Sequence, residues 1–172
     1  MRYLCILLAL AVAGCGGSEE PTAVRGPLCD VLPSGDDPGA PASLRDDAPG
    51  EALTWIPVVT TFEAAARASG IELDGTTILA PTDDAFTKAY DRQELDELLL
   101  ERPRELVEPH IVEGERSLED LLDDGEVITL AGDTLEVTQA GAMARIGRAT
   151  TVCADYDVAG ARIHVIDGVL SR

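Results

Sequence analysis

The stretch Thr76-Thr77-Ile78-Leu79-Ala80-Pro81-Thr82-Asp83-Asp84-Ala85-Phe86 decides the fold of this chain. Residues 77–80 predict a short apolar strand, and Pro81 separates this strand from a helix because proline offers no N–H to a continuing ladder. Thr82 suits the N-cap of that helix, and the two aspartates after it fall in the first turn, where the helix dipole favours negative charge. The stretch therefore predicts a strand-to-helix corner, and such a corner fixes the geometry of a small domain.

The composition of the chain bounds its size and its partners. With 172 residues, the chain is long enough for one domain and a tail. Hydrophobic residues make up 45% of the sequence and aromatic residues only 3%, so aliphatic side chains must build the core. The net charge of −19 argues against nucleic acid as a partner, because phosphate binding needs clustered Lys and Arg. The same charge argues against electrostatic binding to an anionic lipid surface.

The first fifteen residues predict export and lipid attachment. The basic start Met1-Arg2 precedes an apolar run, 3–13, that is too short to span a bilayer and suits a signal peptide. The run ends in Val12-Ala13-Gly14-Cys15, which looks like a bacterial lipobox. We therefore expect residues 1–14 to be a lipoprotein signal peptide and Cys15 to carry the lipid. The protein would then be extracytoplasmic and lipid-anchored in the cell envelope, at the outer membrane or cell surface; the alternative is an ordinary signal peptide and secretion.

Residues 15–49 predict a lipid-anchored flexible tether, because their Gly, Pro, Ser and Asp content cannot bury enough apolar area to order itself. The apolar piece 28–32 interrupts this composition, and its cysteine indicates that the piece is pinned to the domain. With the other two cysteines assigned to the signal peptide and the lipid, Cys29 and Cys153 remain as one pair in an exported protein. We expect them to form a disulfide; the alternative is two free buried thiols.

The body of the chain changes from a helical to an alternating pattern. Apolar spacing predicts helices within 51–70, broken near Pro57, and over 82–90, 93–100, 102–107 and 117–122. Pro57 suits the first turn of the second helix, where its missing N–H costs nothing. Ser117 is expected to cap the last helix, with Asp120 at its N3 position. Alternation then predicts strands at 126–130, 134–138, 142–146, 149–153 and 162–167. Helices first and a largely antiparallel sheet last predict the α+β class.

Four stretches resemble the motifs of one family in order and in spacing. Residues 77–86 resemble the first motif of fasciclin (FAS1) domains, and residues 163–170 resemble the second. Residues 106–114 resemble the central histidine stretch of these domains, and residues 129–137 resemble their hairpin. The residues that carry the match are Thr77, Pro81, Thr82, Phe86, His110, His164 and Asp167. The placement of the cysteine pair also resembles that in secreted and lipid-anchored single-domain fasciclin proteins of mycobacteria.

The resemblance implies a fasciclin domain over residues 50–172, with a β-wedge of about seven mostly antiparallel strands packed with several short helices. It implies adhesion and extracellular recognition instead of catalysis, with an extracellular protein or a polysaccharide as the partner. Two residue pairs are discussed as binding determinants in the family, Tyr-His in the central stretch and Asp-Ile ahead of the second motif. Here Pro109-His110 replaces the first, and Asp157-Val158 is the approximate counterpart of the second. His110, Asp157 and Val158 are therefore the candidate partner-binding residues.

The two histidines of the chain, His110 and His164, could be metal ligands or a general base. We interpret them as core residues that make buried hydrogen bonds. The nearest carboxylate to His164 in sequence, Asp167, would point to the opposite face of a strand, which weakens a metal or catalytic pairing. Sequence motifs of serine hydrolases, zinc proteases and phosphate loops are missing. We therefore expect no enzyme activity, no cofactor and no metal.

Three groups of charged residues also allow a second interpretation. Asp83 and Asp84 could be paired catalytic carboxylates, but their place at a helix start explains them. An acidic series could suggest calcium, but it lacks the alternating ligand loop, so we interpret it as a solvated face; its members are Glu113, Glu115, Glu119, Asp120, Asp123, Asp124 and Glu126. We expect the arginines of the C-terminal strands to pair with local acids, with an anionic-ligand patch as the alternative; they are Arg145, Arg148 and Arg162.

Together these features favour a non-enzymatic, lipid-anchored surface domain that mediates adhesion or contacts with the matrix or cell envelope. The alternative is an envelope module that binds a polysaccharide or a small ligand, and a weaker third hypothesis is an enzyme accessory domain or cryptic hydrolase. A deep pocket with polar groups would favour ligand binding, whereas a flat patch would favour a protein or polymer partner. Contact with the membrane is expected through the N-terminal lipid only.

Overall fold

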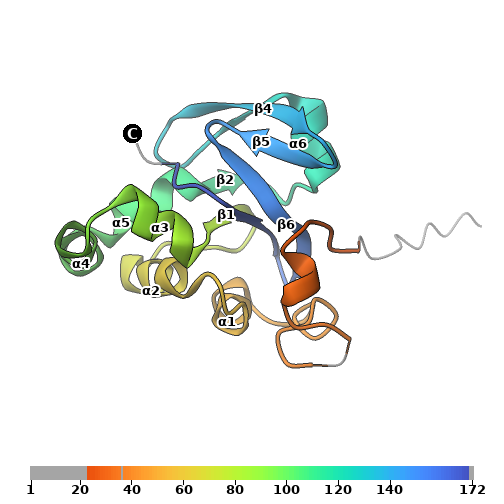
Figure 1. The fold of residues 1–172 in the computed structure, drawn as a ribbon, viewed down its shortest axis with the longest axis horizontal. Coiled ribbons are helices and arrows are strands. Elements are labelled where there is room, and N and C mark those ends of the chain that lie inside the picture. The colour runs from red at the N-terminus through yellow and green to blue at the C-terminus, as the bar shows by residue number, and fades with distance from the viewer. Residues whose placement is uncertain (1–22, 36, 171–172) are drawn as a thin grey trace, which may run out of the picture.

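A computed structural model describes residues 23–35 and 37–170 of the chain, so the predicted signal peptide and Cys15 lie outside the described residues. Seven strands follow one another in the order β2-β1-β7-β6-β5-β4-β3 (Figure 1). Their bounds are β1 Thr76–Pro81, β2 Ile111–Glu113, β3 Glu126–Ile128, β4 Thr134–Ala140, β5 Met143–Ile146, β6 Ala149–Val158 and β7 Ala161–Ile166. β1 and β7 are parallel, and every other neighbouring pair is antiparallel. The predicted α+β class with mostly antiparallel strands is confirmed.

The helices divide between two sides of the central strands. Their bounds are α1 Pro49–Trp55, α2 Thr60–Ser69, α3 Asp83–Ala89, α4 Arg92–Glu101, α5 Pro103–Val107 and α6 Leu118–Asp124, with short 3-10 turns at Cys29–Val31 and Glu108–His110. Figure 1 shows α1 to α5 gathered on one side of β1, whereas α6 lies on the other side with β4 and β5. Within the described ranges, no helix has the length and apolar character needed to cross a bilayer.

The core forms two clusters of buried side chains, one on each side of the central strands. The first contains Phe62 and Phe86 from the helices and Ile78 from β1. The second contains Leu79 from β1 and Leu121 from α6. Neighbouring residues of a strand point to opposite faces, so β1 contributes to both clusters, and all six of its residues are buried. The continuous apolar run that the sequence shows at this position is therefore explained by burial on both faces.

The strand-to-helix corner forms as predicted, with one correction. Pro81 does not separate the strand from the helix; it is the last residue of β1 and lies opposite Ile166 of β7. The strand continues through Pro81 because the N–H of the next residue, Thr82, donates to the carbonyl of Ile166 over 3.0 Å. Thr82 is the N-cap of α3, and its hydroxyl accepts a hydrogen bond from the N–H of Ala85 over 3.2 Å.

The start of α2 is set by a residue of the corner. The sequence predicts that Pro57 lies in the first turn of this helix, but α2 begins at Thr60. The carboxylate of Asp83 accepts hydrogen bonds from the N–H of Thr61 over 2.7 Å, and from the N–H and the hydroxyl of Thr60 over 3.3 and 2.9 Å. Asp83 thus caps α2 from across the chain, in addition to lying in the first turn of α3. A remote cap of this kind has no signature in the local sequence.

The N-terminal segment packs on the domain, which differs from the flexible tether predicted up to residue 49. Leu32, Ala40 and Leu44 are buried in this segment. Arg25 pairs with Ala154 of β6 through two backbone hydrogen bonds of 3.2 and 2.8 Å. The prediction that residues 28–32 are pinned to the domain is confirmed. The tether prediction is wrong for residues 23–27, 33–35 and 37–49, because a few well-placed apolar side chains outweigh the polar average of the composition.

The disulfide between Cys29 and Cys153 is present, and it joins this segment to β6 across a separation of 124 residues. β6 extends to Val158 instead of ending at the predicted residue 153, and its pairing with β7 contains two shifts of register. The predicted capping box at the start of α6 is confirmed, with Ser117 and Asp120 bonded to each other's backbone N–H groups.

We predict that Asp83→Ala lowers the free energy of unfolding by about 1–2 kcal/mol, because α2 loses its cap. Asp84→Ala is the matched control, since Asp84 occupies the same helical turn but its exposed side chain does not reach α2; its cost is below about 0.5 kcal/mol. Urea unfolding followed by circular dichroism measures both values. Equal costs for the two variants would contradict the role of Asp83 as a remote cap.

Candidate functional site

A groove lies beside the strand-to-helix corner, and we name it the corner groove. Its volume is about 440 Å³. The apolar part of its lining comes from Pro27, Leu28, Pro57, Val58 and Val152. The polar part comes from Thr82, Asp83, Asp84, Lys88 and Asp167. Five of the ten lining residues therefore belong to the first motif, the second motif or α3, and the rest come from the N-terminal segment, the α1–α2 turn and β6.

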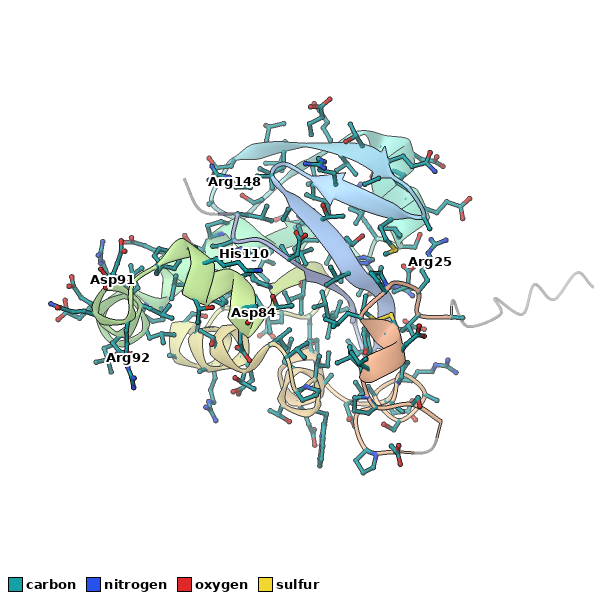
Figure 2. All side chains as sticks on the ribbon, viewed as in Figure 1. Arg25, Asp84, Asp91, Arg92, His110 and Arg148 are labelled. Carbon is teal, nitrogen blue, oxygen red and sulfur yellow. A yellow bond between two sulfur atoms is a disulfide. The ribbon has the colours of Figure 1, made fainter. Side chains whose placement is uncertain are left out.

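The charged groups of the corner groove differ in how firmly they are held. Asp83 caps α2, and one carboxylate oxygen of Asp167 accepts the N–H of Thr150 over 2.7 Å. Asp84 and Lys88 are exposed on α3, and Figure 2 shows Asp84 near the start of that helix. The structure thus brings the two predicted motif residues Thr82 and Asp167 together at one groove, whose lining contains three carboxylates, one ammonium and five apolar residues.

His110 is fully buried and serves the fold. The N–H of Leu170 donates to its Nε2 over 2.9 Å, so its Nδ1 carries the proton and donates to the carbonyl of Leu106 over 2.8 Å. Its ring meets the ring of Phe62 edge-on, with 5.7 Å between centroids. Burial lowers the pKa of His110 to about 4, so the imidazole is neutral at pH 7. The prediction of a core histidine with buried hydrogen bonds is confirmed.

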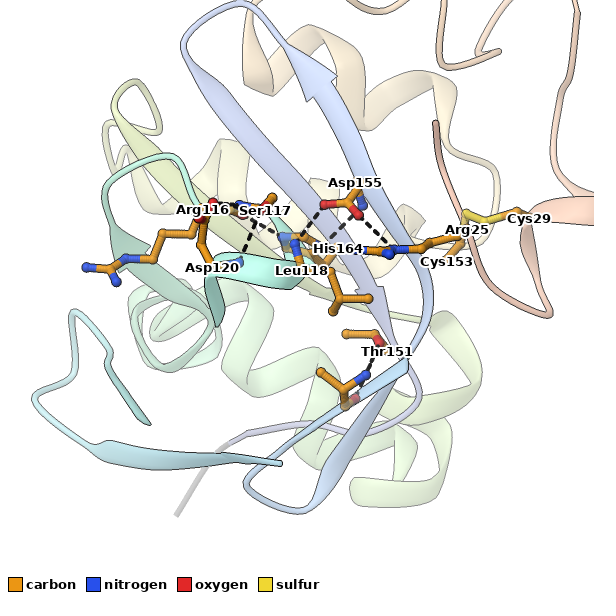
Figure 3. A network of polar contacts seen from close by, with 11 residues as sticks. Arg25, Cys29, Arg116, Ser117, Leu118, Asp120, Thr151, Cys153, Asp155 and His164 are labelled. Atoms are coloured by element: carbon orange, nitrogen blue, oxygen red, sulfur yellow. Dashed lines mark hydrogen bonds and ion pairs between the residues drawn. A yellow bond between two sulfur atoms is a disulfide. The ribbon is translucent and has the colours of Figure 1, made fainter. Parts of the chain in front are cut away.

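His164 is the centre of a second buried polar network (Figure 3). Its Nδ1 accepts the N–H of Asp155 over 3.2 Å, and its Nε2 donates to the carbonyl of Arg116 over 2.9 Å. Burial lowers the pKa of His164, although its bond to the Arg116 carbonyl and the charge of Asp155 act in the opposite direction. Both ring nitrogens of both histidines are thus occupied by backbone groups, and neither ring is placed to exchange a proton with a substrate.

Asp155 links this network to two other parts of the chain, the start of α6 and the N-terminal segment. Its carboxylate accepts the N–H of Leu118 at the start of α6 over 2.8 Å, and it pairs with the guanidinium of Arg25 over 3.1 Å. Its backbone has φ 70°, the one positive value among the described residues other than glycine. Sequence reasoning missed Asp155. Its position within the second shift of register in β6, between Cys153 and Tyr156, explains the unusual backbone, but such a shift depends on the partner strand.

The three candidate partner-binding residues differ in exposure. His110 and Val158 are buried, at 0% and 3% of their full accessible surface. Asp157 reaches the surface, where its carboxylate lies 3.9 Å from the Arg45 guanidinium and 3.6 Å from that of Arg162. Of the three, only Asp157 therefore presents its side chain to solvent, and the partner-binding role itself stays a prediction.

The other charged residues make mostly local contacts. Arg162 pairs with Asp157, as expected, whereas Arg145 and Arg148 are exposed and form no ion pair within the described part of the chain. In the acidic series, Asp124 pairs with Arg116, and hydrogen bonds from Ser117 lower the pKa of Asp120. Among residues 23–35 and 37–170, no three His, Cys, Asp or Glu side chains are placed to hold a metal ion.

Comparison with known proteins gives one consistent result. The family model of the fasciclin domain matches residues 57–172. The protein sll1483 from Synechocystis sp. is 30% identical over 122 residues, which cover 68% of this chain and 67% of that protein. A solved pair of FAS1 domains from the insect cell adhesion molecule fasciclin I aligns with a TM-score of 0.44 and 20% identity. That alignment covers 64% of this chain and 40% of the insect chain.

We predict that His110 makes the domain less stable in mild acid. Its pKa is about 4 in the folded state but about 6.5 in the unfolded state. The unfolded chain therefore binds the proton first, and the free energy of unfolding falls as the pH is lowered from 6.5 to 4, by about 3 kcal/mol from this residue. His110→Gln, which does not titrate and can still accept the Leu170 N–H, should remove this part of the pH dependence. Urea unfolding at pH 7.0, 5.5 and 4.0 makes the comparison; parallel curves for the two proteins would contradict it.

Proposed function

The chain belongs to the fasciclin domain family, and on this premise we propose that it is a lipid-anchored, extracytoplasmic protein that mediates adhesion or contacts at the cell surface. Fasciclin domains are known in proteins of the cell-adhesion type, and they are usually extracellular or on the cell surface. The proposal joins this family role to the lipobox at Cys15.

The observation that carries the proposal is the disulfide between Cys29 and Cys153. Disulfides persist in oxidising compartments and are rare in the cytosol, so the bond supports export. Cys153 is fully buried, and the bond fastens the N-terminal segment to the sheet. An exported domain whose N-terminal segment is fixed in this way suits a protein held by its N-terminus.

Lipidation at Cys15 would also keep the domain close to the membrane. Among the described residues, Val24 is the first that packs against the core, and it lies nine residues after Cys15. Nine fully extended residues span at most about 30–32 Å. Partners of the domain would therefore be molecules of the envelope that lie near the membrane surface.

The buried histidines support a non-enzymatic role, which is general in this family. Both ring nitrogens of His110 and of His164 are bonded to backbone groups. Catalysis by either residue would require the loss of one of these buried bonds and of part of the core around it.

A second candidate function is favoured by the corner groove. A concave, mostly apolar site with a few polar groups is typical of ligand-binding proteins, and the volume of about 440 Å³ suits a small molecule. On this alternative, the anchored domain captures a soluble ligand in the envelope.

We predict that Cys15→Ser transfers the protein from the membrane fraction to the soluble fraction, because the thioether-linked lipid can no longer form. Cys5→Ser is the matched control, since it also removes a cysteine from the N-terminal region but leaves the lipobox intact. Fractionation with immunoblotting gives the distribution, and adhesion of cells is measured in parallel.

Under the proposal, cells that carry only the Cys15→Ser protein adhere less than cells with the wild-type or Cys5→Ser protein. Membrane retention of Cys15→Ser would contradict the lipid anchor. Unchanged adhesion after deletion of the whole protein would contradict the adhesive role.

A further inference from the structure

We propose that the corner groove binds a small amphipathic cation, a ligand with an apolar body and a protonated amine. This inference rests on the second proposed function, ligand binding, and does not depend on the lipid anchor. It is based on the walls of the groove, on the charges at its rim and on how both are fixed.

The apolar walls of the groove are fixed by backbone hydrogen bonds between distant segments. The N–H of Leu28 donates to the carbonyl of Val152 over 2.9 Å, which places one wall against β6. The N–H of Asp83 donates to the carbonyl of Val58 over 2.8 Å, which places the other wall against the start of α3. These bonds fix the shape of the groove, and an apolar body could therefore enter it without a large ordering cost.

The wall formed by Leu28 is held especially closely. A side chain added at Gly26 would have its Cβ only 2.3 Å from the carbonyl oxygen of Val152, so only glycine allows the segment to lie this near to β6. The disulfide of Cys29 to Cys153 lies immediately after Leu28 in the chain. These two constraints keep Leu28 facing the groove, and they give the N-terminal segment a role beyond connecting the domain to its anchor.

The charges of the groove select a cation. Asp83, Asp84 and Asp167 contribute three negative charges, and Lys88 contributes one positive charge. None of the four takes part in an ion pair among the described residues. Asp83 and Asp167 accept hydrogen bonds from neutral N–H and hydroxyl donors instead. The net charge of the rim is thus −2 and is complementary to an ammonium group that stays in water while its apolar body enters the groove.

Two other ligand classes fit less well. A fatty carboxylate would bring a fourth negative charge to the rim and would find only Lys88 as a partner. A bare metal ion would need several converging ligands, and the described residues contain no group of three that could hold one.

The test is a titration of the full chain with three ligands of equal chain length: octylamine, octanol and octanoate. The chain carries Cys15→Ser, so that no attached lipid competes for the groove. Amide shifts in two-dimensional NMR locate binding, and their midpoints give affinities. We expect shifts at Leu28, Val58 and Asp84, with octylamine bound most tightly and octanoate least tightly. Raising the salt concentration should weaken the preference for the amine.

Two charge variants test whether the charges of the groove set the affinity for the amine. Lys88→Glu should raise the affinity for octylamine about two- to fivefold, and Asp84→Asn should lower it by a similar factor. Both side chains are exposed, so neither change disturbs the core. Asp96→Asn on α4 is the matched control, because this exposed residue carries the same charge but does not line the groove; it should leave the affinity unchanged.

A gain of affinity in Lys88→Glu cannot be explained by misfolding, which makes this variant decisive. The proposal is overturned if octanoate binds as tightly as octylamine, if the shifts map away from the corner groove, or if Lys88→Glu and Asp96→Asn behave alike. Binding of all three ligands in the groove with equal affinity would keep the ligand-binding function and reject the cation. No binding of any of them at the groove would reject both, whereas the lipid anchor is judged separately by fractionation.

Discussion

The parallel pairing of β1 with β7 is the interaction on which the rest of the structure depends. It joins Thr76–Pro81, the strand that contains the start of the first motif, to Ala161–Ile166, the strand that contains the start of the second. Because β1 is buried on both faces, it separates the two apolar clusters and gives each of them a wall. The corner groove also depends on this pair, since the N–H of Thr82 donates to Ile166 and thereby sets where α3 begins beside Asp167. A pairing between segments so far apart in the chain must overcome a large loop-closure cost, which the burial on both faces offsets.

The polar interior depends on the same arrangement and limits what the domain can do. His164 of β7 and His110 each hydrogen-bond two backbone groups, and one partner of His110 is the N–H of Leu170, just beyond β7. The chemical groups that remain for function are on the surface, at the corner groove and at the N-terminal segment. That segment is fastened by the disulfide and by the Arg25–Asp155 ion pair, of which the aspartate is fully buried. An anchored domain with a fixed N-terminus and a preformed groove is consistent with recognition at the envelope, as proposed.

Sequence reasoning succeeded where the determinants are local. The cap of α3 by Thr82 and the capping box of Ser117 and Asp120 both depend on residues within one turn of each other. The disulfide could be predicted because the signal peptide and lipid expected from the sequence account for two of the four cysteines and leave one pair. Sequence reasoning failed where contacts between distant segments determine the structure. Asp83 sets the start of α2, and Ile166 lets β1 continue through Pro81. β6 likewise orders an N-terminal segment whose composition predicts a tether. Asp155 was missed for the same reason, since its role exists only after β6 and β7 have paired.

Native-state hydrogen exchange tests the central role of the β1–β7 pair most directly. If this pair organises the domain, the amides of Ile78, Leu79, Ile163 and Val165 exchange only through global unfolding and share one free energy of opening. The amides of the β3–β4 hairpin, at the far edge of the strand order, then exchange through smaller openings. Faster exchange in β1 than in β3 and β4, or separate opening of β1 and β7, would contradict the account.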